Sequence, residues 1–196
     1  MMAFVLASGS PRRRELLASL GIDFTVIKSD VDETQRAGED AFAYVRRLSV
    51  EKAEAVAERL SAPSLVLAAD TTVVLDGDVL GKPLDADDAR AMLRRLRGRD
   101  HVVCTALTLL KLDPPERQSL TDLTRTTVTM RDYADAEIDA YVASGDPSDK
   151  AGAYAIQHEG FHPVARIDGS YSNVVGLPLE TLREMLDHIG YNDSKV

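Results

Sequence analysis

The chain contains the run Leu65-Val66-Leu67-Ala68-Ala69, in which no polar residue alternates with the apolar ones. Such a run predicts a strand that is covered on both faces. Two further strand signals, at residues 72–75 and 79–80, flank Asp76-Gly77-Asp78, a spacing typical of a β-hairpin. We therefore expect a sheet at the centre of the fold.

On the N-terminal side of this run, strand and helix patterns alternate. Residues 4–7 and 24–27 predict short strands. Between them, Ser10 as N-cap and Pro11 at the first helical position predict a helix that extends to Leu20. Apolar residues at helical spacing predict a long helix over residues 39–60.

On the C-terminal side, the pattern predicts a long antiparallel pair of strands among further helices. The expected elements are helices over residues 85–97, 135–144 and 178–189, and strands over residues 102–112 and 120–130. Strands and helices alternate in the first part of the chain, and a hairpin follows. This order indicates an α/β fold with a mixed, elongated sheet.

Composition limits the class of protein. The 196 residues are 44% hydrophobic, and 23 Lys and Arg against 32 Asp and Glu give a net charge of −9, which argues against a nucleic-acid partner. The apolar runs are far shorter than the roughly 20 residues that span a bilayer. The N-terminus lacks a signal-peptide pattern, and the single Cys104 cannot form an internal disulfide. We expect a cytoplasmic protein without a membrane partner. A homodimer is one assembly that the sequence allows.

The first segment that indicates chemistry is Ser8-Gly9-Ser10-Pro11-Arg12-Arg13, where a strand leads into a helix. Backbone N–H groups at a helix N-terminus favour an anion, and arginine matches phosphate oxygens with paired donors. An ordinary capped helix with solvated arginines fits the same residues. The segment alone leaves both interpretations open.

Four charged side chains add candidates for catalysis. Asp70 directly follows the apolar run, where a carboxylate could hold Mg²⁺ or accept a proton from water, or could bond to its own backbone. Lys52 falls on the apolar stripe of its helix, so it either extends to the surface or points at an anion in a cleft. Lys82, in a short turn, and Glu33, in an acidic loop, also fit an ordinary solvated role.

Taken in order, these segments resemble the Maf family of nucleoside triphosphate pyrophosphatases over residues 6–186. The resemblance rests on Ala7-Ser8-Gly9-Ser10-Pro11-Arg12-Arg13, Glu51-Lys52-Ala53, Ala68-Ala69-Asp70-Thr71, Gly81-Lys82-Pro83, Asp149-Lys150-Ala151-Gly152-Ala153-Tyr154 and the segment 170–178. It implies one Maf-like α/β domain over residues 1–196. In this fold two lobes surround a central cleft, as in the inosine triphosphate pyrophosphatases.

The resemblance also implies a reaction, in which a nucleoside triphosphate is hydrolysed to monophosphate and pyrophosphate with a divalent metal (Mg²⁺, Mn²⁺ or Co²⁺). By position, Asp70 resembles the general base, and Glu33 with Asp70 resembles the metal pair. Lys52 and Lys82 resemble catalytic phosphate contacts. The remaining implied substrate-binding residues are Ser8, Ser10, Arg12, Arg13, Thr71 and Gln157.

Three of these positions, Arg12, Thr71 and Gln157, match those that set base preference in the family. Their combination is similar to the branch that acts on dTTP and UTP, and differs from the 7-methyl-GTP branch. The alternative function is a non-catalytic, nucleotide-binding regulator of septum formation. Such a regulator would need the cations but not the metal carboxylates, so the presence of both Glu33 and Asp70 favours the enzyme.

Overall fold

The computed structural model describes residues 2–61, 63–158 and 160–191. Within these ranges one seven-stranded sheet has the order β2-β1-β3-β5-β6-β7, with β4 paired to β3. Its strands are β1 (Ala3–Leu6), β2 (Thr25–Val26), β3 (Ser64–Leu75), β4 (Asp78–Leu80), β5 (Asp100–Asp113), β6 (Glu116–Met130) and β7 (Val164–Asp168). Strands β1 and β2, and β1 and β3, pair in parallel, whereas the other pairs are antiparallel. The expected mixed α/β sheet is confirmed.

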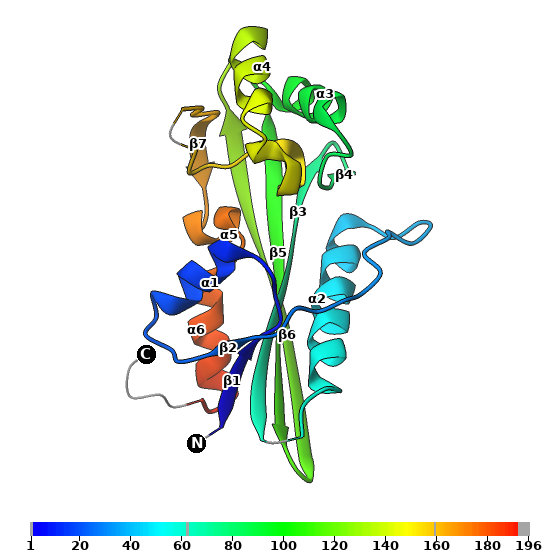
Figure 1. The fold of residues 1–196 in the computed structure, drawn as a ribbon, viewed down its shortest axis with the longest axis vertical. Coiled ribbons are helices and arrows are strands. Elements are labelled where there is room, and N and C mark those ends of the chain that lie inside the picture. The colour runs from blue at the N-terminus through cyan, green and yellow to red at the C-terminus, as the bar shows by residue number, and fades with distance from the viewer. Residues whose placement is uncertain (1, 62, 159, 192–196) are drawn as a thin grey trace.

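Helices cover this sheet in two lobes (Figure 1). The helices are α1 (Pro11–Ala18), α2 (Ala41–Ala57), α3 (Ala86–Leu96), α4 (Asp135–Ala143), α5 (Tyr171–Val175) and α6 (Leu179–His188), with short 3₁₀ segments η1 (Asp146–Asp149) and η2 (Ala151–Ala153). One lobe contains α1, α2 and α6, and the other contains α3 and α4. The long strands β3, β5 and β6 run through both lobes.

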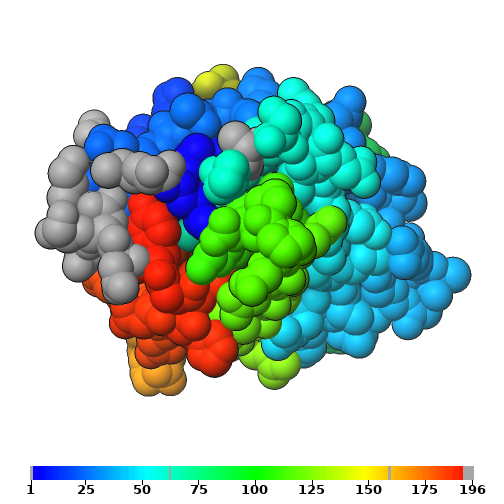
Figure 2. Space-filling model, turned by 90° about the horizontal axis from the view of Figure 1, so that it is seen from below, coloured from blue at the N-terminus to red at the C-terminus, as the bar shows by residue number. Residues whose placement is uncertain are grey.

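The apolar run of β3 is covered on both faces, as its composition predicts. Leu65 and Leu67 belong to a buried cluster with residues of α1 and α6, while Val66 and Ala68 pack with residues of α2. In Figure 2 the hairpin of β5 and β6 (green) stands between the α2 region (cyan) and α6 (red). Alternate side chains of β3 therefore point to opposite helical layers.

One prediction for the centre of the sheet is wrong. Strand β3 does not end at Ala69 but continues through Asp70 to Leu75, so two predicted strands are one. Continuous pairing with β5 explains the difference, because Asp70 lies opposite Ala106 and Thr71 lies opposite Thr105. No helix within the described ranges is both long and apolar enough to cross a membrane.

Candidate functional site

A cavity of about 620 Å³ is lined by residues from both lobes. Every side chain that the sequence predicts for the site lines it, namely Ser8, Ser10, Arg12, Arg13, Glu33, Lys52, Asp70, Thr71, Lys82 and Gln157. These residues come from the start of α1, from α2, from β3 and from four connecting segments. The fold thus brings together positions that are up to 149 residues apart in the chain.

The cavity lies at a gap along one edge of β3. Strand β1 pairs with β3 only as far as Leu67, and β4 pairs with it only from Val73 onward. Asp70 and its neighbours stand between these two stretches. Ligands bind at the carboxyl ends of parallel strands in open α/β sheets. Here the strand that ends is β1, at Leu6, and not β3 as the sequence suggests.

The central contact of the site is a lysine between two carboxylates. The Nζ atom of Lys52 lies 2.6 Å from Oδ1 of Asp70 and 2.6 Å from Oε1 of Glu33. The side chains of Lys52 and Asp70 are only 9% and 10% exposed, respectively. The interpretation that Lys52 extends to the surface is therefore wrong. The Nζ atom of Lys82 adds a second, more distant cation 3.8 Å from Oε2 of Glu33.

The two carboxylates that share Lys52 differ in acidity. Burial raises the pKa of Asp70 above its ordinary value, against the opposing effects of Lys52 and Arg13. Burial acts on Glu33 in the same direction, but its hydrogen bond and charge interaction with Lys52, together with the charges of Lys82 and Arg13, lower the pKa of Glu33. The more basic Asp70 is suited to accept a proton, whereas Glu33 is suited to remain ionised.

The same pair of carboxylates fits a divalent metal. Glu33 and Asp70 already converge on one cation, the ammonium of Lys52. Mg²⁺ is commonly bound by one or two carboxylates together with substrate phosphates and water, rather than by an all-protein cage. The described part of the chain contains no group of three or more His, Cys, Asp or Glu side chains placed to hold a metal.

Arg13 forms the opposite wall and is bonded in three directions. Its Nε atom donates to the carbonyl oxygen of Gly176 at 2.8 Å, and Nη2 donates to Oγ1 of Thr71 at 2.9 Å. Nη1 donates to Oγ of Ser8 at 3.3 Å, and burial lowers the pKa of the guanidinium. Arg13 is thus not a solvated arginine, and two of its five N–H donors remain beyond these three bonds.

The neighbouring helix terminus has the expected local structure. Ser10 is the N-cap of α1, and its Oγ accepts from the backbone N–H of Arg13. Oγ of Ser8 accepts from the backbone N–H of Ser10 at 3.2 Å. Both hydroxyl groups therefore shape the turn that leads from β1 into the cavity.

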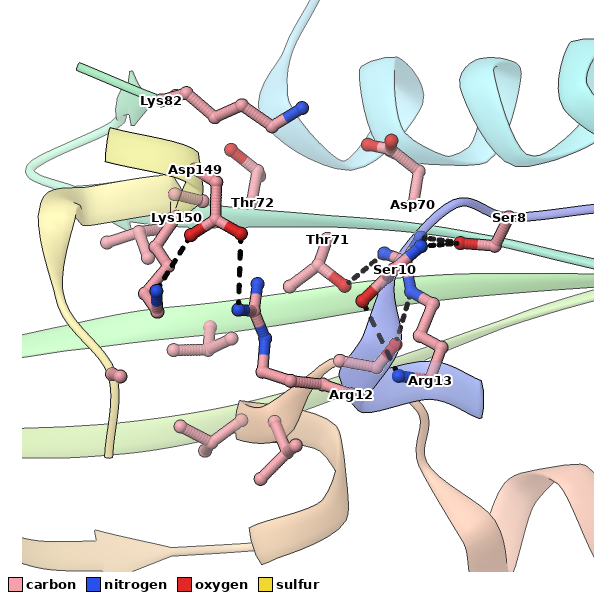
Figure 3. Close-up of a pocket in the computed structure, with 18 of the residues that line it drawn as sticks. Ser8, Ser10, Arg12, Arg13, Asp70, Thr71, Thr72, Lys82, Asp149 and Lys150 are labelled. Carbon is pink, nitrogen blue, oxygen red and sulfur yellow. Dashed lines mark hydrogen bonds and ion pairs between the residues drawn. The ribbon is translucent and has the colours of Figure 1, made fainter. Parts of the chain in front are cut away.

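The residues predicted for base preference lie on three different segments. Arg12 extends across the cavity, where its Nη1 lies 3.6 Å from Oδ2 of Asp149 in η1 (Figure 3). Thr71 points to the face of β3 opposite Asp70, and its Oγ1 lies 2.9 Å from Oγ1 of Thr105. Gln157 is exposed in a turn that lines the cavity.

Sequence reasoning missed several residues of this cavity. Further lining side chains are Tyr44, Thr72, Asp149, Lys150 and Tyr154. Helical spacing could have identified Tyr44, because it precedes Lys52 by eight residues and thus lies on the same side of α2. Burial, followed by the charges of Asp70 and Glu33, raises the pKa of Tyr44 to about 12.

Comparison with known proteins gives consistent matches over most of the chain. The family model described as "Maf-like protein" matches residues 3–189. A "dTTP/UTP pyrophosphatase" of Myxococcus xanthus is 54% identical over 186 residues, which cover 95% of this chain and 92% of the relative. A protein of the same name from Hahella chejuensis is 51% identical over 177 residues, covering 89% and 86%.

Solved structures are similar in fold alone. The Ham1 protein of Staphylococcus aureus has a TM-score of 0.54 at 16% identity, over 95% of this chain and 99% of that one. A HAM1 protein from Coxiella burnetii has a TM-score of 0.52 at 16% identity, over 96% and 100%. These likenesses support the two-lobed α/β architecture.

Proposed function

The chain belongs to the family of Maf-like proteins, and we propose that it is a nucleoside triphosphate pyrophosphatase that acts on dTTP and UTP. The products are the nucleoside monophosphate and pyrophosphate. The observation that carries this proposal is the buried contact of Lys52 with Asp70 and Glu33 on the wall of a cavity that also presents Arg12 and Arg13.

The charges of this cavity suit a triphosphate. Lys82, Arg12 and Arg13 supply cations to its walls, although the chain as a whole is acidic. Fixed cations stabilise the negative charge that develops on a leaving pyrophosphate. A divalent metal held by Glu33 and Asp70 would supply further neutralisation of the phosphate oxygens.

Asp70 is the proposed general base. Its carboxylate accepts a proton from a water molecule as the water oxygen forms a bond with the α-phosphorus. The bond between the α-phosphorus and the α–β bridging oxygen breaks, and pyrophosphate leaves with that oxygen. The raised pKa of Asp70 favours the proton transfer. Lys52 holds the carboxylate in place and stabilises its ionised form.

Base selection is proposed for residues at the other end of the cavity. Gln157 offers both an amide donor and an acceptor, which suits the imide edge of uracil or thymine. The planar guanidinium of Arg12 can stack on a base or donate to a carbonyl oxygen. The hydroxyl group of Thr71 accepts from Arg13 and so helps to hold that guanidinium in the cavity.

We further propose that residues 1–196 act as one domain, because β3, β5 and β6 contribute to both lobes. The test of the function is pyrophosphate release from UTP, dTTP, CTP, GTP and 7-methyl-GTP, each with Mg²⁺, Mn²⁺ or Co²⁺. The expected result is a preference for UTP and dTTP that requires the metal. Nucleotide binding without release would contradict the enzyme and favour a nucleotide-binding regulator, and a preference for 7-methyl-GTP would contradict the substrate assignment.

A further inference from the structure

The Glu33 loop, residues 27–40, joins β2 to α2 and carries one of the two carboxylates of the site. Two side chains of α2 donate to consecutive carbonyl oxygens of this loop. The hydroxyl group of Tyr44 donates to the carbonyl oxygen of Glu33 at 2.8 Å. Nη2 of Arg47 donates to the carbonyl oxygen of Thr34 at 3.1 Å.

Arg47 is itself held firmly. Its Nε and Nη2 donate to the two carboxylate oxygens of Glu39, at 2.6 and 2.7 Å, in a bidentate pair. Its Nη1 donates to Oε2 of Glu51 at 3.0 Å. The side chains of Arg47 and Glu39 are only 13% and 10% exposed. Such a pair is both stronger and more directional than a single charged hydrogen bond.

Side chains of one helix, α2, thus bind both the carboxylate of Glu33 and the backbone that carries it. Lys52 of α2 binds the carboxylate, while Tyr44 and Arg47 fix the backbone next to it. Arg47 does not itself line the cavity. It reaches the site through the loop and through the ring of Tyr44, whose centroid lies 5.6 Å from its guanidinium carbon. A loop anchored at the residue after Glu33 leaves that carboxylate little freedom to move away.

We propose that Arg47 is a positioning residue that holds the Glu33 loop against α2 and so sets the place of the Glu33 carboxylate. The expected effect of Arg47 on turnover rests on the proposed function, whereas its expected effect on the Glu33 loop does not. It assigns no contact with substrate to Arg47. The prediction is that losing Arg47 acts on the reaction only while Glu33 is present.

The experiment compares Arg47→Met with Arg46→Met. Arg46 is the adjacent arginine on the exposed side of α2, so its variant controls for loss of charge and for helix propensity. The amides to follow are those of Thr34 and Arg36, which donate to the carboxylates of Asp32 and Glu39. Their hydrogen exchange, measured without metal, should be faster in Arg47→Met and unchanged in Arg46→Met. A lysine at position 47 retains the charge without the bidentate fork, so Arg47→Lys should restore only part of the protection.

Turnover provides the second measurement, in a double-mutant cycle with Glu33→Gln. Arg47→Met should lower kcat/KM for UTP by about tenfold or more, since small displacements of catalytic groups are costly. In the Glu33→Gln background the same change should have almost no effect. An equal loss in both backgrounds, or unchanged exchange of the loop, would overturn the inference.

A failure of the inference about Arg47 can be distinguished from a folding defect and from a failure of the proposed function. If Arg47→Met does not fold, Tyr44→Phe removes the hydroxyl donor to Glu33 alone and should accelerate exchange of the same amides. If the wild type releases pyrophosphate from no triphosphate, the proposed function fails. The exchange measurement then still decides whether Arg47 holds the loop.

Discussion

The Nζ atom of Lys52 lies 2.6 Å from Oδ1 of Asp70, and both side chains are almost completely buried. The same nitrogen also binds Glu33, so one ammonium group compensates two carboxylates. A buried carboxylate that loses its cation is costly, because the surroundings no longer solvate its charge. The contact therefore links the stability of the fold to the chemistry of the site.

Replacing Lys52 with Met should lower stability as well as turnover. Asp70 would be left buried and unpaired, which costs on the order of 3 kcal/mol in the free energy of unfolding. Urea unfolding at pH 7 measures the loss. The matched control is Lys82→Met, which removes an exposed cation 3.8 Å from Glu33 and should change stability by less than about 1 kcal/mol. Equal stability of Lys52→Met and the wild type would contradict a stabilising buried pair.

Asp70→Asn should abolish most of the turnover while the fold is retained. The amide is nearly isosteric, but it cannot accept a proton from water, and a positioned base contributes about 10²-fold or more to the rate. Lys52 keeps Glu33 as a partner in this variant. Steady-state kinetics with UTP, together with a thermal melt of the same sample, checks both statements. Near-normal turnover in a folded variant would remove Asp70 from the mechanism.

Gln157→Glu should reduce the use of pyrimidine triphosphates selectively. The change replaces an amide donor with a second acceptor, and the loss of a matched hydrogen bond costs about 1–3 kcal/mol. The measurement is kcat/KM for UTP, dTTP, CTP and GTP in the variant and the wild type. Inhibition by pyrophosphate is the internal control and should be unchanged. An equal loss for all four triphosphates would show that Gln157 does not select the base.

His101 should make the fold sensitive to mild acid. Its ring is buried against Tyr154, with Nε2 and the phenol oxygen 2.8 Å apart, and burial lowers its pKa from 6.5 to about 4. Between these values the unfolded chain binds more protons than the folded one, so stability falls as the pH decreases. This group alone should remove about 2 kcal/mol between pH 7 and pH 5.

Urea unfolding of the wild type and of His101→Gln at both pH values checks this expectation. The variant lacks the titrating ring, so its stability should change less across the same interval. The folded state raises or lowers the pKa of several carboxyl groups too, but these groups are present in both proteins. An identical pH dependence of the two proteins would contradict a neutral, buried His101.

Local patterns were sufficient for most of the fold. The apolar run of β3 correctly predicted coverage on both faces, because Leu65 and Val66 do pack in different clusters. Asp70, which follows the run, suggested a strand end, because Asp is depleted in strands. Instead Asp70 and Thr71 continue the pairing with β5 and face the cavity from opposite sides of one strand.

Strand β7 and helix α5 escaped prediction because long-range contacts maintain them. Strand β7 is mostly exposed and, among the described strands, pairs with β6 alone, so it has no core-facing pattern. Helix α5 has five residues, and its buried Asn173 donates to the carbonyl oxygen of Val103 and to Oγ1 of Thr126. Neither partner can be identified from the residues next to Asn173.

The sequence identified residues that line one cavity, but not the contacts among them. Motif positions placed all the candidate residues around one cavity. They did not indicate that Lys52 binds two carboxylates, or that Arg13 donates to the carbonyl oxygen of Gly176. Such partners depend on how α2 and α5 pack on the sheet, which spacing along the chain does not encode.

The continuity of β3 limits how this site can evolve. Asp70 and Thr71 are adjacent on one strand and serve opposite faces, and β5 fixes their register. The insertion or deletion of a single residue upstream of them would exchange their faces and turn the carboxylate towards Arg13. Substrate specificity can therefore change by substitution or by remodelling of the loops around the cavity. A one-residue change in the length of this strand would instead remove the Asp70 carboxylate from its position in the site.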